Sequence, residues 1–401
     1  MFDVDGIKKD FPIFKNHPEI HYLDSAASSL KLNKVIDKLD YYYNFLSVNV
    51  NRGPYKLSYE ATNLYDDSRI NIAKHLNCNS NEIIFTRGAT NSLNLASLLL
   101  EPLINENDEI ITSELEHNSS ILPWINICKK KNAKLVYVPL TKEGRITIDN
   151  FKKVINKNTK IVALTHVSNV MGYITPVKEI CKISKEYKAI TIIDGAQAIP
   201  HMKVDLKDLN CDFYCFSGHK MLGPTGIGIL YGRYELLDKL EPVEYGGDMA
   251  LDVSKENQTY KKPPYKFEAG TPIIAEAIAL SEAFDYLDKI GYDNIHKHEQ
   301  DLFKYTYDKL SKIKEVIIHN PTCETGVLTF NVKDIHPHDV AQILNEDNVY
   351  VRVGNHCAHI CANFLKVDGT IRASFYLYND YKDCDALVNS VKRAIDFFGK
   401  F

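Results

Sequence analysis

Two neighbouring segments of the chain carry an acid and a lysine at positions where both can act on one ligand. Asp194 ends an apolar run in the sequence IIDGAQ (residues 192–197), and Lys220 lies in a small polar turn, CFSGHK (residues 215–220). A lysine in such a turn can form a Schiff base with an aldehyde, and an acid across the site can pair with a pyridinium nitrogen. Together the two residues indicate pyridoxal phosphate. The alternative is a helix-capping Asp and an ordinary surface Lys.

A third segment, TRGATN (residues 86–91), has the residues of a phosphate site. It follows an expected strand and opens an expected helix, so free backbone N–H groups at Ala89 and the hydroxyl of Thr90 can bind an anion. Ser217 and His219 offer further donors. Alone, the segment is weak evidence, because an ordinary turn between a strand and a helix has the same residues more often than a phosphate site does.

The elements around these segments form the pattern of an α/β fold. Short apolar runs alternate with longer amphipathic runs from about residue 80 to 232, which is typical of strand–helix units around a mostly parallel sheet. Ligands bind at the carboxyl ends of such strands, where Asp194 and Lys220 are expected. His117, in SELEH (residues 113–117), follows another strand and is the type of residue that stacks on a planar ring. Strands are expected at 83–86, 109–112, 134–138, 160–165, 190–194, 212–216 and 226–231, and helices at 91–100, 118–130 and 177–187.

The pattern predicts two domains. Residues 20–275 form the large α/β domain, with a Gly- and Pro-containing excursion at 244–272. Residues 1–19 together with 276–401 form a smaller α+β domain. A long helix begins near Ile274, strands are expected at 327–332, 349–352 and 370–374, and helices at 339–345 and 385–398.

Composition excludes several classes of protein. The 401 residues are 45% apolar and 25% charged, and 48 basic against 52 acidic residues give a net charge of −4, so the chain lacks the positive field of a nucleic-acid binder. The N-terminus lacks a secretory signal, and no apolar run is long enough to span a bilayer. Nine scattered cysteines are typical of free thiols in a reducing compartment. We therefore expect a cytoplasmic protein that uses neither membrane nor nucleic acid.

Specific residues argue against a metal site, a nicotinamide dehydrogenase and a non-catalytic carrier. His356, Cys357, His359 and Cys361 lie within six residues, but structural zinc sites usually take ligands from two separated pairs, so we expect no metal. A nicotinamide dehydrogenase would need a G-x-G-x-x-G sequence, which is absent. A non-catalytic persulfide carrier would have no need of Lys220.

The motifs occur in a fixed order with others along the whole chain. They are HYLDSAA (21–27), NVNRG (49–53), RGATN (87–91), EHNS (116–119), DGAQ (194–197), SGHKMLGPTG (217–226), GGDM (246–249), FEAGTP (267–272) and RVGNHCA (352–358). With this set the chain resembles a class V, fold-type I pyridoxal-phosphate enzyme, specifically a group II cysteine desulfurase of the SufS type. The short RVGNHCA segment and the 244–272 excursion favour group II over group I.

The resemblance implies roles for the cofactor site. Lys220 holds the cofactor and moves a proton at the substrate Cα, Asp194 pairs with the pyridine nitrogen, and His117 stacks on the ring and takes part in catalysis. Gln197 bonds the phenolic oxygen. The phosphate is bound by Ala89, Thr90, Ser217 and His219, and by Thr271 of the partner subunit in a homodimer.

The resemblance also implies how substrate is handled. The thiolate of Cys357 attacks the sulfur of L-cysteine and leaves L-alanine and an enzyme persulfide. A reactive thiol needs nearby positive charge, which we expect from His356, His359 and Arg352. The substrate is fixed by Asn169, Arg352 and Arg372, and Arg372 grips its carboxylate with two hydrogen bonds.

The implied role is sulfur supply for iron–sulfur cluster assembly, through a SufE-like or SufU-like acceptor protein and a cluster scaffold. The chain departs from the family pattern at Asn51, Tyr55, Asn355 and Ile360, which puts the identity of the acceptor in doubt. A selenocysteine lyase, a cysteine sulfinate lyase and an aminotransferase remain alternatives on the same fold, although an aminotransferase has no use for Cys357.

Overall fold

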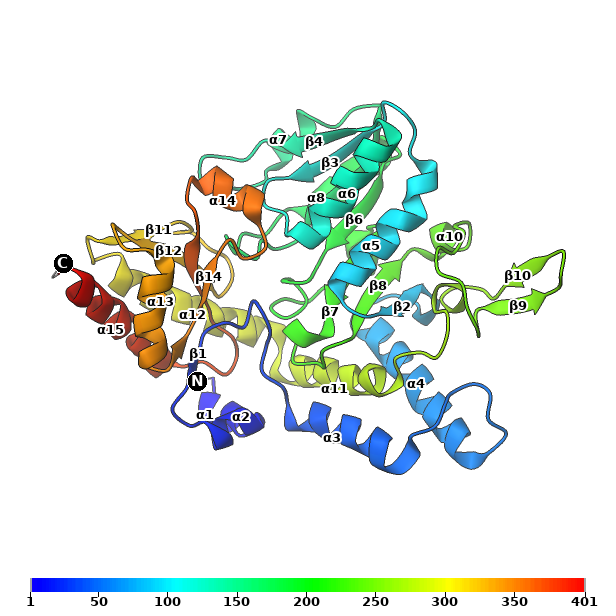
Figure 1. Cartoon of the computed structure of the whole chain (residues 1–401), viewed down its shortest axis with the longest axis horizontal. Coiled ribbons are helices and arrows are strands. Elements are labelled where there is room, and N and C mark those ends of the chain that lie inside the picture. The colour runs from blue at the N-terminus through cyan, green and yellow to red at the C-terminus, as the bar shows by residue number, and fades with distance from the viewer. Residues whose placement is uncertain (1, 400–401) are drawn as a thin grey trace.

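The computed structural model describes residues 2–399. Its large sheet has seven strands (Figure 1). Their order is β2-β8-β7-β6-β5-β3-β4, and β8 alone runs antiparallel to its neighbours. The mostly parallel α/β sheet is therefore confirmed. The strands are β2 (Ile83–Thr86), β3 (Glu109–Ser113), β4 (Lys134–Val138), β5 (Thr159–Thr165), β6 (Ile190–Asp194), β7 (Phe213–Ser217) and β8 (Gly228–Gly232).

Both faces of this sheet are buried. Phe213 and Cys215 of β7 pack in one hydrophobic cluster with residues of α5, while Tyr214 and Phe216 pack on the other face with residues of α4 and α11. This alternation follows from the two-residue period of a strand. The main helices of this part are α3 (Asn33–Tyr41), α4 (Lys56–His75), α5 (Ala89–Leu100), α6 (Asn118–Lys131), α8 (Val177–Glu186) and α11 (Ile274–Ile290). Because α11 crosses residues 275–276 and packs against α3 and α4, the division of the chain there stays a prediction.

The C-terminal unit is built on a four-stranded antiparallel sheet in the order β11-β12-β15-β14. The prediction of one continuous strand at 349–352 is wrong. Its first part, β13 (Val349–Tyr350), pairs with β1 (His21–Tyr22), and β14 (Arg352–Gly354) joins the larger sheet. The other elements are β11 (Val316–Ile318), β12 (Val327–Val332), β15 (Thr370–Ser374), α12 (Tyr292–Leu310), α13 (Pro337–Glu346), α14 (His359–Leu365) and α15 (Tyr381–Phe398).

Helix starts are the least well predicted boundaries. The helix expected from residue 385 begins at Tyr381, because the Asp380 carboxylate accepts hydrogen bonds from the N–H groups of Lys382 (2.8 Å) and Asp383 (3.2 Å). Likewise α13 begins two residues before the expected position, at Pro337, after the cap His336. Short helices complete the chain: α1 (Val4–Lys8), α2 (Pro12–Asn16), η1 (Tyr42–Leu46), η2 (Ser80–Glu82), η3 (Glu101–Leu103), α7 (Ile148–Lys152), α9 (Leu206–Leu209), η4 (Gly218–Lys220), α10 (Tyr234–Leu237) and η5 (Tyr265–Phe267).

The excursion at 244–272 is more ordered than a loop. It contains an antiparallel hairpin, β9 (Ala250–Val253) and β10 (Gln258–Tyr260), which projects from the body of the molecule in Figure 1. Leu251 and Val253 are 74% and 69% exposed at this hairpin. Among residues 2–399, no helix is long and apolar enough to cross a bilayer.

Candidate active site

A cavity of about 160 Å³ lies where the large sheet meets the C-terminal unit. It brings together, from distant parts of the sequence, nearly all the residues predicted for the site. The predicted residues that line it are Ala89, Thr90, His117, Asn169, Asp194, Gln197, Ser217, His219, Lys220, Arg352 and Arg372. Cys357 adjoins the cavity through its neighbour His356 and through Arg352. Thr271 is exposed and does not line the cavity, so its assignment to a partner's site stays a prediction.

Lys220 ends η4, the short turn that follows β7. Gly218 begins this turn, and a Cβ there would lie 2.9 Å from Ile227, so only glycine fits. Burial lowers the pKa of Lys220 to about 8; the charge of Asp194 opposes this shift, and those of Arg372 and Arg352 add to it. The neutral amine that attacks an aldehyde carbon is therefore accessible close to neutral pH.

Asp194 ends β6 and is buried. Its Oδ1 accepts a hydrogen bond from the N–H of Ala196 at 3.0 Å. Burial raises the pKa of this carboxyl group, while the Ala196 hydrogen bond and the charge of Lys220 oppose the rise. A buried carboxylate that lines a cavity is stabilised by a cation, and a pyridinium nitrogen would provide one.

Gln197 and His117 present the polar and flat groups that a ring needs. The Gln197 side-chain Nε2 donates to the Ala26 carbonyl at 2.7 Å, and its Oε1 is buried without a partner among residues 2–399. This orphaned acceptor fits a ligand hydroxyl. The Nδ1 of His117 accepts from the N–H of Ser119 at 3.1 Å, and burial lowers the pKa of His117 to about 4, with Lys220 contributing. The imidazole is therefore neutral, with its proton on Nε2.

The start of α5 brings together the residues predicted to bind an anion. Gly88, with φ of 145°, directs the backbone into the helix, and the N–H of Ala89 donates to Ser217 Oγ at 2.7 Å. The expectation that the Ala89 N–H is free for an anion is therefore wrong, because Ser217 accepts it, but the Ser217 hydroxyl hydrogen remains available to a phosphate oxygen. Thr90 Oγ1 lies 2.7 Å from Ser119 Oγ. Helix dipole, backbone N–H groups and hydroxyls together suit a phosphate.

A hollow of about 470 Å³ adjoins the cavity at this helix start, and His219 lines both. Burial lowers the pKa of His219 to about 4, and Lys220 and Lys31 contribute to the shift. A neutral His219 acts toward an anion through a ring N–H, not through charge.

Arg372, on β15, is positioned for a carboxylate. It is 1% exposed; its Nη1 donates to the Asn169 carbonyl at 2.9 Å and its Nη2 to Asp24 Oδ1 at 3.1 Å. The buried Nε has no partner among residues 2–399, so its N–H is free to donate. Sequence analysis gave Asp24 no role in the site, because nothing in the sequence signals a pair of residues 348 positions apart.

Cys357 lies on an exposed left-handed turn. His356 and Cys357 have φ of 51° and 55°, a conformation that non-glycine residues rarely adopt. Two contacts anchor the turn: the Asn118 N–H donates to the Cys357 carbonyl at 2.7 Å, and Asn169 Nδ2 donates to the His356 carbonyl at 2.8 Å. The Arg352 Nη2 lies 3.7 Å from the Cys357 sulfur. A cation therefore lies beside the exposed thiol.

The expectation that His356 supplies positive charge to this thiol is wrong. Burial lowers the pKa of His356 to about 3, with Arg372 and Arg352 contributing, and its Nε2 lies 2.8 Å from Thr370 Oγ1. His356 is therefore neutral. His359 faces Asn118, whose Nδ2 lies 3.0 Å from its Nδ1.

The metal alternative finds no geometric support. Cys361 is fully buried in a hydrophobic cluster, whereas Cys357 is exposed, so the two sulfurs face different environments. Burial raises the pKa of Cys361 to about 12, which disfavours the thiolate that a metal needs. Within the described part of the chain, no three His, Cys, Asp or Glu side chains are grouped to hold an ion.

The chain belongs to the class-V aminotransferase family, whose model matches residues 21–387. It is 48% identical over 398 residues to a probable cysteine desulfurase of Halalkalibacterium halodurans, with 98% of each chain covered. It is also 48% identical over 404 residues to a probable cysteine desulfurase of Staphylococcus aureus, covering 99% of this chain and 98% of the relative.

Solved structures of cysteine desulfurases have a similar fold. An apo cysteine desulfurase from Thermococcus onnurineus superimposes with a TM-score of 0.94 at 39% identity over 98% of both chains. The cysteine desulfurase CsdA of Escherichia coli gives 0.92 at 33% identity over 99% of both. The fold-type I architecture is confirmed, and the lysine, the buried acid, the orphaned acceptor and the helix start all fit the pyridoxal phosphate of this family.

Proposed function

We propose that this chain is a pyridoxal-phosphate-dependent cysteine desulfurase of group II, which converts L-cysteine to L-alanine and carries the sulfur as a persulfide on Cys357. One observation carries the proposal: an exposed cysteine beside Arg352 adjoins a cavity that holds both Lys220 and Asp194. An aminotransferase has no use for that thiol. The full-length similarity to probable cysteine desulfurases supports the same activity.

The side chains divide the work between binding and proton transfer. Pyridoxal phosphate, when bound, supplies an acceptor for the electrons released at the substrate Cα. Arg372 and Asn169 hold the substrate carboxylate, and Asp194 holds the proton on the ring nitrogen. Lys220, with its lowered pKa, takes a proton from Cα and later returns one.

The transfer of sulfur from the substrate to Cys357 needs no further reactant. The Cys357 thiolate attacks the substrate sulfur, an S–S bond forms and the substrate C–S bond breaks. The bonding pair stays with the substrate carbon, which takes up a proton and becomes the methyl group of alanine. Arg352 Nη2, 3.7 Å from the sulfur, places a positive charge beside the reacting atom.

We also propose a homodimer. The aromatic side chains of Tyr43 and Phe45 in η1 and of Tyr59 in α4 are 58%, 67% and 61% exposed, and large exposed apolar side chains can mark a protein–protein interface. In this proposed dimer, Thr271 of the partner subunit contributes to the phosphate site. Analytical ultracentrifugation tests the assembly: a monomer at micromolar concentration contradicts it.

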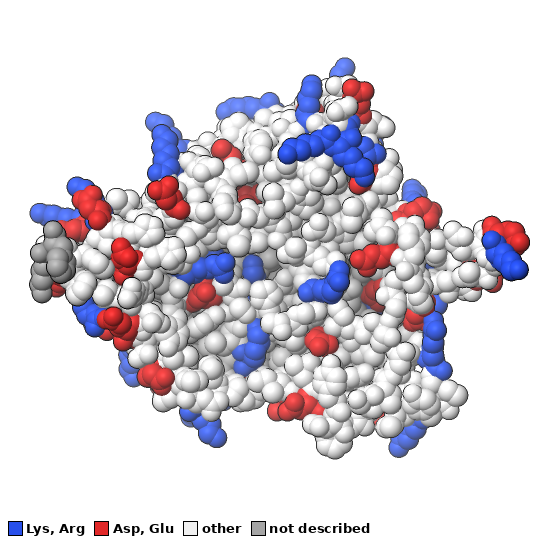
Figure 2. Space-filling view, in the orientation of Figure 1, with Lys and Arg blue, Asp and Glu red and all other residues white. Residues whose placement is uncertain are grey.

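Sulfur on Cys357 must pass to another molecule, because one thiol accepts one sulfur atom. We propose a SufS-type role in the cytoplasm, with a SufE-like or SufU-like acceptor protein and a scaffold for iron–sulfur clusters. The exposure of Cys357 supports transfer to a protein thiol. On the face in Figure 2, acidic and basic side chains are interspersed, without a block of one sign.

Alanine formation with and without Cys357 tests the activity. We expect Cys357→Ser to keep the bound cofactor and lose alanine formation from L-cysteine. Cys78→Ser is the matched control, because Cys78 is the other cysteine that is not fully buried and it does not line the cavity. Undiminished sulfur release by Cys357→Ser would instead identify a lyase that eliminates sulfur directly.

A further inference from the structure

The loop Asn169–Ile174, here called the bridging loop, connects the two units through its backbone. Four consecutive carbonyl groups accept hydrogen bonds from side chains of the C-terminal unit. The pairs are Asn169 with Arg372 Nη1 (2.9 Å), Val170 with Thr329 Oγ1 (2.5 Å), Met171 with Asn320 Nδ2 (3.0 Å) and Gly172 with Thr325 Oγ1 (3.1 Å). One segment of the large domain is thus bound, residue by residue, to the C-terminal unit.

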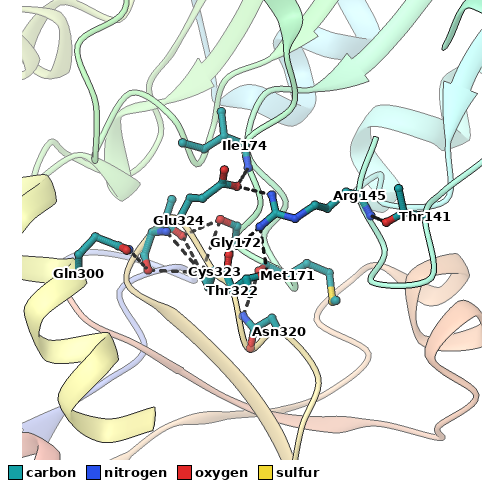
Figure 3. A network of polar contacts seen from close by, with 11 residues as sticks. Thr141, Arg145, Met171, Gly172, Ile174, Gln300, Asn320, Thr322, Cys323 and Glu324 are labelled. Carbon is teal, nitrogen blue, oxygen red and sulfur yellow. Dashed lines mark hydrogen bonds and ion pairs between the residues drawn. The ribbon is translucent and has the colours of Figure 1, made fainter. Parts of the chain in front are cut away.

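The Ile174 end of the bridging loop is bound by the carboxylate of Glu324 (Figure 3). Glu324 Oε2 accepts from the N–H of Ile174 at 3.0 Å and from Arg145 Nη1 at 2.7 Å. Gly172 has φ of 62°, and a Cβ there would lie 2.3 Å from Cys323 Sγ, so the backbone packs directly on the C-terminal unit. The loop therefore has no room to shift alone.

The near end of the loop reaches the reacting groups. Asn169 lines the cavity and its Nδ2 donates to the His356 carbonyl, next to Cys357. Its own carbonyl holds Arg372. A displacement of the bridging loop would therefore move the substrate-binding groups and the base of the nucleophile turn together.

Thr329 lies in the same cross-strand row as the site arginines. On β12 it pairs with Arg372 of β15, which in turn pairs with Arg352 of β14. Residues directly opposite in antiparallel strands have their side chains on the same face. The Thr329 hydroxyl is thus the contact that ties this row to Val170, one residue from Asn169.

We propose that the bridging loop is the element through which the C-terminal unit positions Asn169 and Arg372, and that Thr329 is a positioning residue for the substrate carboxylate. Thr329 does not line the cavity, so it acts through Val170 and not on substrate itself. Val170 and Thr329 are both buried, so water does not replace the hydroxyl when it is removed. The identity of the substrate rests on the function proposed above.

The test is Thr329→Val, which keeps the shape of the side chain and removes its donor. We expect the holoenzyme's dissociation constant for L-alanine, read from cofactor absorbance, and the KM for L-cysteine each to rise about tenfold, with kcat within about twofold. Thr329→Ser, which restores the hydroxyl, should return both to within about twofold of the wild type. Thr306→Val is the matched control, because Thr306 is equally buried, its hydroxyl donates to Leu302 within α12, and it has no contact with the bridging loop among those that the structure gives it.

The outcomes separate positioning from general stability. An unchanged KM and L-alanine affinity in Thr329→Val, or an equal rise in Thr306→Val, would overturn the proposal. If Thr329→Val does not fold, Thr325→Val carries the same test through Gly172, with a rise expected to be about threefold. A wild-type enzyme that binds L-alanine but forms no persulfide refutes the proposed function, while the L-alanine comparison among the variants still tests the positioning role.

Discussion

The lysine side of the cavity is enclosed by the large sheet, whereas the Cys357 side chain is exposed on a turn that follows β14. Asp194 and Lys220 follow adjacent strands whose faces are both covered, and burial sets the pKa of each. The Cys357 turn has left-handed backbone at two residues, and Arg352 Nη2 lies 3.7 Å from the sulfur. Proton transfer needs fixed geometry, while a sulfur atom that must leave the enzyme needs access.

The largest effect is expected at the enclosed side. Lys220→Ala should abolish the visible absorbance of the bound cofactor and reduce alanine formation by at least about 10³-fold, because both the covalent attachment and the proton carrier are lost. Absorption spectra and an alanine assay measure this. Lys220→Arg, which keeps the charge, should be as inactive; substantial turnover by that variant would contradict the assigned role.

Arg372→Lys tests the substrate-binding group that lies between the enclosed lysine side of the cavity and the Cys357 turn. A lysine lacks the planar guanidinium whose separate nitrogens reach Asn169 and Asp24, so we expect the KM for L-cysteine to rise about 100-fold with a smaller change in kcat. Arg393→Lys is the control, since Arg393 pairs with Asp347 on the surface. A KM within about twofold of the wild type would show that the carboxylate binds elsewhere.

The pH dependence of cofactor capture sharpens the contrast further. The apoenzyme should take up pyridoxal phosphate faster as the pH rises through about 8, where Lys220 loses its proton. Removing a positive charge in Arg352→Gln should move this midpoint to higher pH, and removing a negative charge in Asp194→Asn should move it to lower pH. Stopped-flow absorbance gives the midpoints; a midpoint near that of an ordinary lysine would contradict the effect of burial.

The smallest effects are expected at the exposed turn. Arg352→Gln should slow alkylation of Cys357 by iodoacetamide about threefold to tenfold, because the cation near the sulfur is lost. His356→Gln should leave the rate within about twofold, because His356 is neutral and faces Thr370. Peptide mass spectrometry measures both rates, and a larger effect at His356 would reverse the assignment.

The enclosed region was the easier one to predict from sequence. Apolar runs with a polar residue at the carboxyl end locate Asp194 and Lys220, because the geometry of a parallel sheet brings such ends together. The helix after β2 follows from the same pattern, although it begins at Ala89, two residues before the expected Asn91. Each of these signals depends on residues that lie close together in the sequence, so the sequence alone reveals it.

The contacts that sequence could not predict join distant segments. The pairing of Asp24 with Arg372, and of Thr329 with Val170, depends on how two units pack, and no local pattern encodes it. The strand expected at 349–352 divides because its halves find partners in different sheets. The charge state of His356 was mispredicted because burial, which the sequence does not reveal, outweighs its intrinsic basicity.

The most direct test of the central claim is a peptide map of the purified holoenzyme after a single exposure to L-cysteine without reductant. The account predicts one added sulfur atom on the peptide that contains Cys357, with L-alanine formed in equal amount. Alanine or sulfide formed without sulfur on Cys357 would contradict it.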